Sequence, residues 1–553
     1  MEMRKRRRLL KPSLRTLFLS ILSFILFLSH NSRVFRIIPT FSFSETNFIS
    51  SSTTSRSSIL LLRIQSRILL PNSLLVFLHK GGHSINHVLT TSHDIDCVYR
   101  HGQRLAFHPA LTASDFDHFR WMLRCPLPPA NYSSAVTLQW HNSPSRRRTR
   151  IPPAALEPPK WDWVAYAAEV DGRTAVVFVK GLNLRPDKDY DPRQFRCRFQ
   201  SGKSSMLTTA ISAAQEVVRC PLPDTLIIND KAVKVSIDRR RRQLLPSIAR
   251  LYGNQLKTQN PNKHQLCACT MVWNQASALR EWITYHAWLG VERWFVYDNN
   301  SDDGLGEEID KLNSDNNYNI TRHAWPWIKS QEAGFSHCVL RAKNQCSWVA
   351  FFDVDEFFYF PPPTKHHNNN DTASSTTIKK GGGLRELVAA AAAEIGEIRT
   401  KCHSFGPSGL TTRPRHGVTV GYTCRLQRPE RHKSIVRPEA VDDNLMNAVH
   451  HFRLREGYVF QDTGEGTALI NHYKYQVWDV FKSKFSRRVS TYVADWQDSQ
   501  NEGSRDRAPG LGNDPVQPLD WKMWYCEVWD TGLRDFVLAN FAHLNTGLLP
   551  WDT

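Results

Sequence analysis

The hydrophobic and polar residues of this chain follow two different patterns, and the change falls near residue 265. Between Asp94 and Ile237, short apolar runs are separated by proline-rich and polar turns, a pattern that predicts a small β-rich domain. From Leu266 onwards, buried-strand runs alternate with amphipathic helical stretches. A run over 267–272, a helical stretch over 276–289 and a second run over 294–297 predict a β-α-β unit. The predicted fold class is therefore α/β, preceded by a β-rich domain.

Polar residues follow both strands of this β-α-β unit. Ligands of open α/β sheets bind at the carboxyl ends of the strands, so these loops are candidate nucleoside ligands. The alternative for the acidic loop is an ordinary turn rich in Asp and Asn. The predicted nucleoside ligands are Asn274, Asp298, Asn300 and Asp303.

The next aromatic strand, which begins at Trp348, ends in Asp353, Asp355 and Glu356. Clustered carboxylates at the end of a buried strand repel one another, and burial raises their pKa values. A divalent cation relieves both effects, and carboxylate oxygens suit Mg²⁺ or Mn²⁺. The sequence therefore predicts a site for a cation and a diphosphate at Asp353 and Asp355. Arg341 and Lys343, on a predicted helix before this strand, are candidate phosphate ligands, and the alternative for them is a solvated helix face.

The N-terminus predicts a membrane anchor. Seven basic residues lie before residue 16, and no charged residue occurs from Thr16 to Ser32. Basic residues before an apolar span hold the N-terminus in the cytosol. We expect a tail and anchor over 1–30, a stem over 31–93 and a lumenal remainder, as in a single-pass type II protein of the Golgi membrane. The alternative is a cleaved signal or a transit segment.

The remaining expectations on organisation follow from composition. Residues 94–255 are expected to be the β-rich domain and 263–553 the α/β domain, with a low-complexity insertion over 365–383 and no internal repeat. The 11 cysteines predict several disulfides and one leftover thiol. Glycosylation sequons occur at Asn131, Asn319 and Asn370, and a fourth at Asn299 is expected to be buried. The candidate disulfide pairs are Cys97–Cys125, Cys197–Cys220 and Cys402–Cys424.

The net charge of +19 does not predict a nucleic-acid-binding protein, because much of the excess lies in short runs such as 146–150 and 239–242. An acidic polysaccharide or an anionic membrane face also suits such a surface.

An ordered series of motifs extends over about 266–496. Its members are Trp273-Asn274, Glu281-Trp-Ile283, Tyr285-His286, Gly290-Val291, Tyr297–Asp302, Cys338, Arg341-Ala-Lys343, Trp348–Phe357, Lys433–Pro438, His450–Phe452, Asn471–Lys474 and Lys482–Arg488. Taken in order, these motifs resemble glycosyltransferase family 92, whose members include plant β-1,4-galactan synthases.

The resemblance implies a GT-A fold with a Rossmann-like nucleotide half, a UDP-sugar donor such as UDP-galactose, Mn²⁺ (or Mg²⁺) and an inverting reaction. His472 is the expected third metal ligand, and its alternative role is that of a hydrogen-bonded core histidine. Lys474, Lys482 and Lys484 are expected near the diphosphate. Asp462 and Glu465 are the candidate bases, with simple turn residues as the alternative.

The expected function is transfer of galactose to a cell-wall glycan such as β-1,4-galactan, by a protein that binds no nucleic acid. The choice between a monomer and a homo-oligomer stays open. One alternative is a transferase of the same fold that uses another UDP-sugar or a protein-linked glycan acceptor. A second alternative is a non-enzymatic glycan-binding protein.

Overall fold

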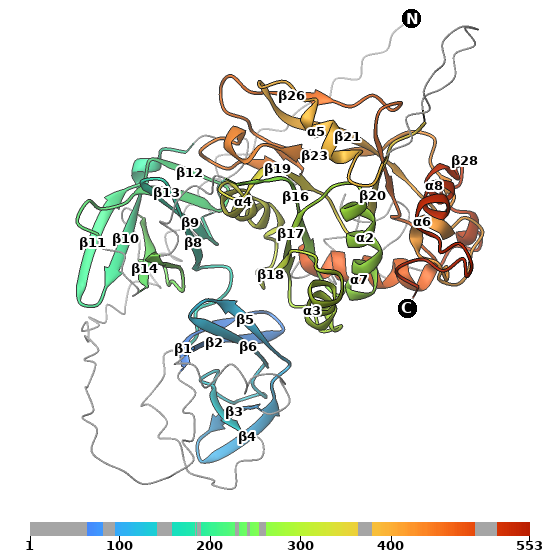
Figure 1. Ribbon diagram of the computed structural model, residues 1–553. Helices are drawn as coiled ribbons and strands as arrows, with labels where there is room; N and C mark the ends of the chain where they lie inside the picture. Colours follow the sequence, from blue (N-terminus) through green and yellow to red (C-terminus); the bar gives the residue numbers. More distant parts are fainter. Residues whose placement is uncertain are drawn as a thin grey trace, which may run out of the picture. The chain divides into compact units, whose positions relative to one another are not determined.

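The computed structural model describes residues 64–80, 95–140, 157–182, 184, 190–226, 232–239, 244–253, 262–362, 379–448, 450–492 and 517–552 (Figure 1). The predicted anchor over 1–30 and most of the predicted insertion lie outside these ranges. Among the described residues, no helix has the length and apolar character that a membrane span requires.

Seven strands, β1 to β7, form a first β-sandwich. Apolar residues of β2 and β3 face each other across its core, and the Cys97–Cys125 disulfide joins β3 to β6. The stem assignment needs correction, because residues 64–79 form β1 and β2 of this sandwich. One sheet has the order β1(Ile64–Leu69), β2(Ser73–His79), β6(Arg120–Pro126), β5(Thr112–Asp117), and the other has β4(Arg104–Pro109), β3(Ile95–His101), β7(Thr137–Trp140).

The next seven strands, β8 to β14, repeat this arrangement strand for strand. The Cys197–Cys220 disulfide joins β10 to β13, which are the counterparts of β3 and β6. The short strand β15(Arg250–Leu251) extends one of the sheets. The sheet orders are β8(Ala165–Asp171), β9(Thr174–Val179), β13(Val217–Pro221), β12(Ser212–Ala214) and β11(Ser204–Thr209), β10(Phe195–Ser201), β14(Val233–Arg239), β15.

The two sandwiches are copies of one unit, so the expectation of no internal repeat was wrong. The two copies share the cysteines of the disulfide and the residues that a turn geometry requires. Their core positions differ in sequence, because a core position requires only an apolar side chain of suitable size. Each first cysteine is followed five residues later by a glycine with positive φ, at 59° in Gly102 and 57° in Gly202. Arg-Cys-Pro-Leu-Pro occurs at 124–128 and again at 219–223.

A nine-stranded mixed sheet forms the core of the α/β domain. Strands β18, β17, β16 and β19 are parallel neighbours, and β23 runs antiparallel to β19. Counted from β16, the parallel strands have the order 3-2-1-4, as in one part of a Rossmann-type sheet. The sheet has the order β18(Ile320–Ala324), β17(Arg293–Asp298), β16(His264–Val272), β19(Cys346–Phe351), β23(Arg431–Val436), β21(Ile395–Ser404), β27(Leu469–His472), β20(Glu356–Tyr359), and β26(Val459–Asp462) pairs with β21.

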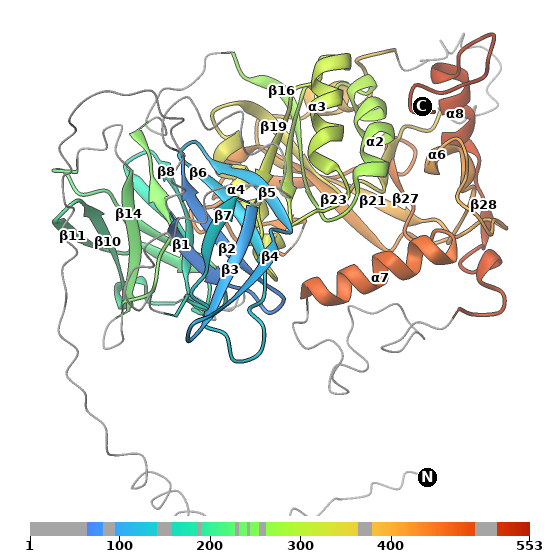
Figure 2. The ribbon, with the colours of Figure 1, turned by 90° about the horizontal axis from the view of Figure 1, so that it is seen from below.

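Both faces of this sheet are buried, because alternate residues of its strands join different apolar clusters. Leu266 and Ala268 pack with α2(Ala276–Trp288), α3(Leu305–Asn316) and α5(Leu384–Ala389). Helices α2 and α3 lie side by side (Figure 2). Cys267 and Cys269 pack with α4(Gln331–Ala342). The remaining elements are α6(Val418–Gly421), α7(Trp478–Tyr492), α8(Gly532–Phe541), β22(Cys424–Arg425), β24(Asn447–Ala448), β25(His451–Phe452) and β28(Val528–Trp529).

Ten of the eleven cysteines form five disulfides. The predicted pairs Cys97–Cys125 and Cys197–Cys220 are confirmed. The predicted pair Cys402–Cys424 is wrong, because Cys424 bonds Cys526 and Cys402 is a buried free thiol. The two remaining disulfides, Cys267–Cys346 and Cys269–Cys338, tie β16 to β19 and to α4.

Candidate active site

The acidic cluster lies where two strands of the sheet meet. β19 ends at Phe351, the acidic turn follows, and β20 begins at Glu356. β20 pairs antiparallel with β27, and this register sets Glu356 directly opposite His472. The sheet therefore brings together residues more than a hundred positions apart in the chain.

Asp355, Glu356 and His472 form a site that fits a divalent cation. One ligand atom from each lies within 4.8 Å of the other two. His472 Nε2 lies 3.4 Å from Asp355 Oδ2, and His472 Nδ1 lies 3.5 Å from Glu356 Oε1. Two carboxylates and an imidazole are ligands that Mn²⁺ accepts. The structure thus brings together two of the three predicted ligands, Asp355 and His472.

Asp353, the other predicted ligand, faces a buried lysine. Its Oδ2 lies 2.8 Å from Lys433 Nζ, which also lies 2.8 Å from Glu356 Oε1 and 2.6 Å from His450 Nε2. Burial alone would raise the pKa of Asp353, but Lys433 and His450 together outweigh burial and lower this pKa to about 2. Glu356 rather than Asp353 completes the set of ligand atoms.

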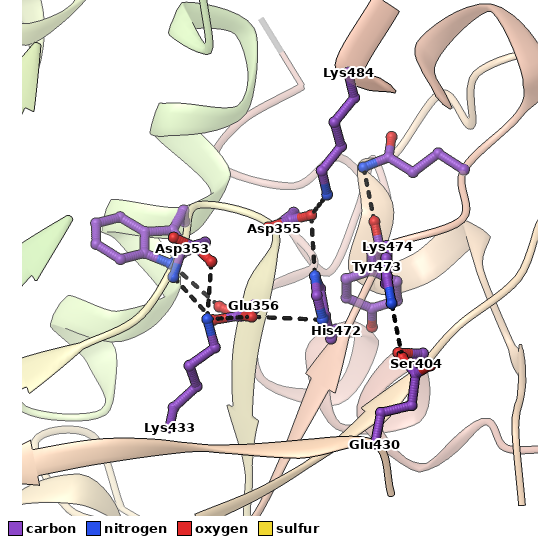
Figure 3. A network of polar contacts seen from close by, with 12 residues as sticks. Asp353, Asp355, Glu356, Ser404, Glu430, Lys433, His472, Tyr473, Lys474 and Lys484 are labelled. Atoms are coloured by element: carbon purple, nitrogen blue, oxygen red, sulfur yellow. Dashed lines mark hydrogen bonds and ion pairs between the residues drawn. The ribbon is translucent and has the colours of Figure 1, made fainter. Parts of the chain in front are cut away.

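Lys484 of α7 forms an ion pair with Asp355 on the side away from Lys433 (Figure 3). Burial would raise the pKa of Asp355, but Lys484 and His472 together lower it. A lysine at this position can reorient to contact a bound phosphate, because its ammonium group is carried by a flexible side chain. Lys474 instead pairs with Glu430, at 3.0 Å, and Lys482 is exposed.

The predicted nucleoside ligands do lie together, in the loops after β16 and β17. Asn274 and Asp302 form two reciprocal hydrogen bonds: Asn274 Nδ2 donates to Asp302 Oδ1 (2.6 Å), and Asp302 N donates to Asn274 Oδ1 (2.8 Å). Asp303 accepts a hydrogen bond from Ala276 N at the start of α2. These side chains are at the surface, where they can meet a ligand.

The other two predicted nucleoside ligands are engaged within the protein. Asp298 is buried against Arg322 and accepts a hydrogen bond from Ser301 N at 2.8 Å. The side chain of Asn300 donates to Pro326 O at 3.3 Å. Both side chains therefore hold the loop in place through contacts within the protein.

Arg341 and Lys343 do not lie at the acidic cluster. Arg341 Nη1 lies 3.0 Å from His323 Nδ1, and Lys343 Nζ lies 2.7 Å from Asp171 Oδ1 of the second sandwich. The residues precede β19, whereas the acidic turn follows it, and six residues of strand span about 20 Å. The prediction that they bind phosphate is corrected for this reason.

Asp462 and Glu465, the predicted bases, also lie apart from the cluster. Glu465 pairs with Lys401 at 3.2 Å and with His403 at 3.7 Å. Ser404, the next residue in β21 after His403, donates a hydrogen bond to Glu430, which also pairs with Lys474. Successive residues of a strand face opposite sides of the sheet, so His403 and Ser404 point to opposite faces. Glu465 therefore lies on the far side from Glu430. Asp462 is exposed at the end of β26.

Sequence reasoning missed four residues of this polar network: Glu356, Lys433, His450 and Glu430. Glu356 was recognised only as one acid in a run, and strand register alone shows that it faces His472. Lys433 and His450 lie in motifs of the resemblance, but no pattern in the sequence shows that they contact each other. Glu430 lies in a polar loop without a distinguishing pattern.

Comparison with known proteins agrees with the motifs. The model of glycosyltransferase family 92 matches residues 262–507. A glycosyltransferase family 92 protein of Ricinus communis is 50% identical over 511 residues, which cover 89% of this chain and 85% of that protein. One of Arabidopsis thaliana is 48% identical over 503 residues, which cover 89% of this chain and 84% of that protein.

Among solved structures, S. aureus TarS 1–349 in complex with UDP is similar over 32% of this chain and 48% of that chain. It is 13% identical with a TM-score of 0.21, too slight a likeness to support an inference. The sequence identity and the coverage of the two plant relatives establish the family, and they confirm the family that the motifs predicted. This chain belongs to glycosyltransferase family 92.

Proposed function

We propose that this glycosyltransferase has a GT-A catalytic domain and takes its sugar from a nucleotide diphosphate donor, with the cation site of Asp355, Glu356 and His472 at the diphosphate. The observation that carries the proposal is the convergence of these ligand atoms within 4.8 Å, next to two lysines. An acidic cluster flanked by cations suits a ligand that carries both a metal ion and phosphate oxygens.

The residues of the chain have separate tasks in this proposal. A bound Mn²⁺ would supply Lewis-acid neutralisation of the departing diphosphate. Lys484 can turn from Asp355 to a phosphate oxygen and neutralise part of its charge. Lys433 stays buried between Asp353 and Glu356 and holds both carboxylates in place. Asn274, which is partly buried after β16, and Asp302, which is exposed after β17, are candidates for contact with the nucleoside.

The finer assignment is an inverting transfer of galactose from UDP-galactose to a cell-wall glycan such as β-1,4-galactan. The sequence resemblance to plant galactan synthases supports it. A donor panel tests it: the purified protein is incubated with Mn²⁺, several UDP-sugars and oligosaccharide acceptors, and products are measured by mass spectrometry. Hexose addition from UDP-galactose is expected, and addition from a different UDP-sugar alone would refute this donor.

The role of the cation site is tested by Asp355→Asn, with Asp310→Asn on the surface of α3 as the matched control. We expect the Asp355 variant to lose at least about 100-fold in kcat, because several kcal/mol of charge stabilisation disappear with the metal. The control should keep its turnover. Wild-type turnover in Asp355→Asn would contradict the proposed site.

A non-enzymatic glycan-binding protein is the second candidate function, and the duplicated β-sandwich favours it. Glycan binding alone would survive Asp355→Asn and would need no nucleotide sugar. The same pair of variants therefore separates the two functions.

The location proposed from the sequence is the Golgi membrane, with a type II anchor and a lumenal catalytic domain. The basic N-terminal tail with its apolar segment and the sequons support it. Sensitivity of the expressed protein to a deglycosidase is expected, and resistance would contradict this location.

A further inference from the structure

We infer that Glu430 is the general base that takes the proton of the acceptor hydroxyl. This inference rests on the proposed transfer. An inverting transfer needs a carboxylate on the acceptor side of the sugar, opposite the departing diphosphate. Of the two residues that the sequence suggested for this task, Glu465 lies on the far side from Glu430, and Asp462 is exposed at the end of β26.

The backbone holds Glu430 next to the cation site. Glu430 lies just before β23, and its N–H donates to the carbonyl of Cys402 in β21 at 3.0 Å. Ser404, two residues further along β21, is directly opposite His472 of β27 in the register of the sheet. The Ser404 hydroxyl donates to Glu430 Oε2, so this carboxylate is a near neighbour of the cation ligand His472.

Lys474 fixes the Glu430 carboxylate from the other side. Its Nζ donates to Glu430 Oε2 at 3.0 Å (Figure 3). Lys474 follows His472 by two residues in the chain, and its N–H donates to the carbonyl of His472 at 2.8 Å, so a tight turn keeps the two residues close. Glu430, Lys474 and His472 are neighbours in one polar network, with the cation ligands at one end and the Glu430 carboxylate at the other (Figure 3).

Glu430 is more accessible than the two carboxylates of the proposed cation site, and it is about as accessible as Asp353, which is 32% exposed. The Glu356 side chain is fully buried and that of Asp355 is 12% exposed, whereas the Glu430 side chain is 34% exposed. Asp353 is paired with Lys433. Burial would raise the pKa of Glu430, but Lys474 and Ser404 outweigh it, and the pKa is lowered. The carboxylate is thus ionised at neutral pH and open to an incoming hydroxyl.

The proposed step balances without a further reactant. The acceptor oxygen forms a bond to the anomeric carbon while its proton moves to a Glu430 oxygen. The bond from that carbon to the diphosphate oxygen breaks, and its electron pair leaves with the diphosphate. Glu430, then protonated, returns its proton to water. Lys474 is a positioning residue, since it acts through the Glu430 carboxylate.

The test compares Glu430→Gln with Glu465→Gln and Asp462→Asn in the transfer assay. Glutamine keeps the size of the side chain and an oxygen acceptor for Ser404 and Lys474. We expect Glu430→Gln to lose about 10²- to 10⁴-fold in kcat, the usual contribution of a general base. Its affinity for UDP with Mn²⁺, measured by calorimetry, and its melting temperature should equal those of the wild type. The two comparison variants should keep their turnover.

Lys474→Met and Lys474→Arg separate positioning from folding. The methionine variant should lower kcat with little change in the KM for the donor, and the arginine variant should restore part of kcat, because it keeps a cation beside Glu430. A rise in donor KM at unchanged kcat would instead assign Lys474 to the diphosphate and remove it from this inference.

Near wild-type kcat in Glu430→Gln, or a large loss in Glu465→Gln or Asp462→Asn, would overturn the assignment of the base. In both cases the wild type still transfers sugar, so the proposed function stands. If the wild type transfers sugar from no donor, the proposed function fails, and the base assignment fails with it.

Discussion

At the scale of single residues, the site depends on a lysine that the sequence did not single out. Lys433 lies between Asp353 and Glu356, and these carboxylates together outweigh burial and raise its pKa. Removing Lys433 would leave the charges of Asp353 and Glu356 uncompensated inside the protein. The resulting loss of folding free energy exceeds what the intact ion pairs contribute.

Lys433→Met should therefore destabilise the catalytic domain by about 3–5 kcal/mol. Thermal unfolding measures the loss, and Lys401→Met, which removes an exposed ion pair with Glu465, is the matched control. The control should melt within a degree or two of the wild type. If Lys433→Met and the wild type had the same melting temperature, Lys433 would not be buried between Asp353 and Glu356.

His286 carries a second residue-scale prediction, on pH. The His286 side chain is fully buried, and burial lowers its pKa to about 3. Its Nδ1 lies 2.8 Å from Trp282 O, and its Nε2 accepts a hydrogen bond from Phe358 N at 3.3 Å. An unfolded histidine has a pKa of about 6.5, so between these values the unfolded state binds more protons. Stability contributed by His286 should fall as pH falls from about 6.5 towards 3.

His286→Gln should show a shallower decrease of melting temperature between pH 7 and pH 5 than the wild type, because one proton-binding group of the unfolded state is gone. The variant will start from a lower melting temperature. Parallel curves for the two proteins would contradict a neutral buried His286.

At the scale of elements, strand direction explains which predicted site residues lie at the same edge of the sheet. Asn274 and Asp355 follow the carboxyl ends of the parallel strands β16 and β19, where the β-α-β pattern and the aromatic run from Trp348 placed them. Arg341 and Lys343 belong to the helix before β19, and such a helix ends at the opposite edge of the sheet. Pattern alone shows which residues end a strand, whereas the pairing of β20 with β27, which unites Glu356 and His472, depends on contacts distant in sequence.

The second sandwich offers a test of its own packing. Arg219 is 4% exposed and pairs with Asp171 at 2.8 Å, whereas Arg173 and Asp224 form an exposed pair at 3.1 Å. Arg219→Met should cost about 1.5–3 kcal/mol, as measured by chemical unfolding, because Asp171 loses one of its two charged hydrogen-bond partners and keeps Lys343. Arg173→Met should change nothing measurable. Similar effects of both variants would contradict the burial of Arg219.

At the scale of the whole molecule, composition predicted an oxidised protein with several domains, and the five disulfides agree. The cysteine pairs within single sandwiches were predicted correctly, but closeness in sequence is not sufficient, because the predicted pair Cys402–Cys424 was wrong. The Cys424–Cys526 pair joins positions 102 residues apart, and spacing carries no information at that distance. The duplication was overlooked for a related reason, since the copies share turn and disulfide residues but not core residues.

The free thiol gives a prediction for the whole chain. Iodoacetamide should label no cysteine of the native protein and one after unfolding without reductant, and peptide mass spectrometry should identify it as Cys402. Labelling of Cys424 or Cys526 would contradict the disulfide pattern.

The central claim is that the acidic cluster holds the cation of a nucleotide diphosphate. Its most direct test is a crystal of the protein grown with Mn²⁺ and UDP, measured at the manganese absorption edge. The account predicts an anomalous peak within coordination distance of Asp355 and His472, with the diphosphate bound to it and Lys484 turned towards a phosphate oxygen. A manganese peak away from these residues, or UDP bound elsewhere on the molecule, would contradict it.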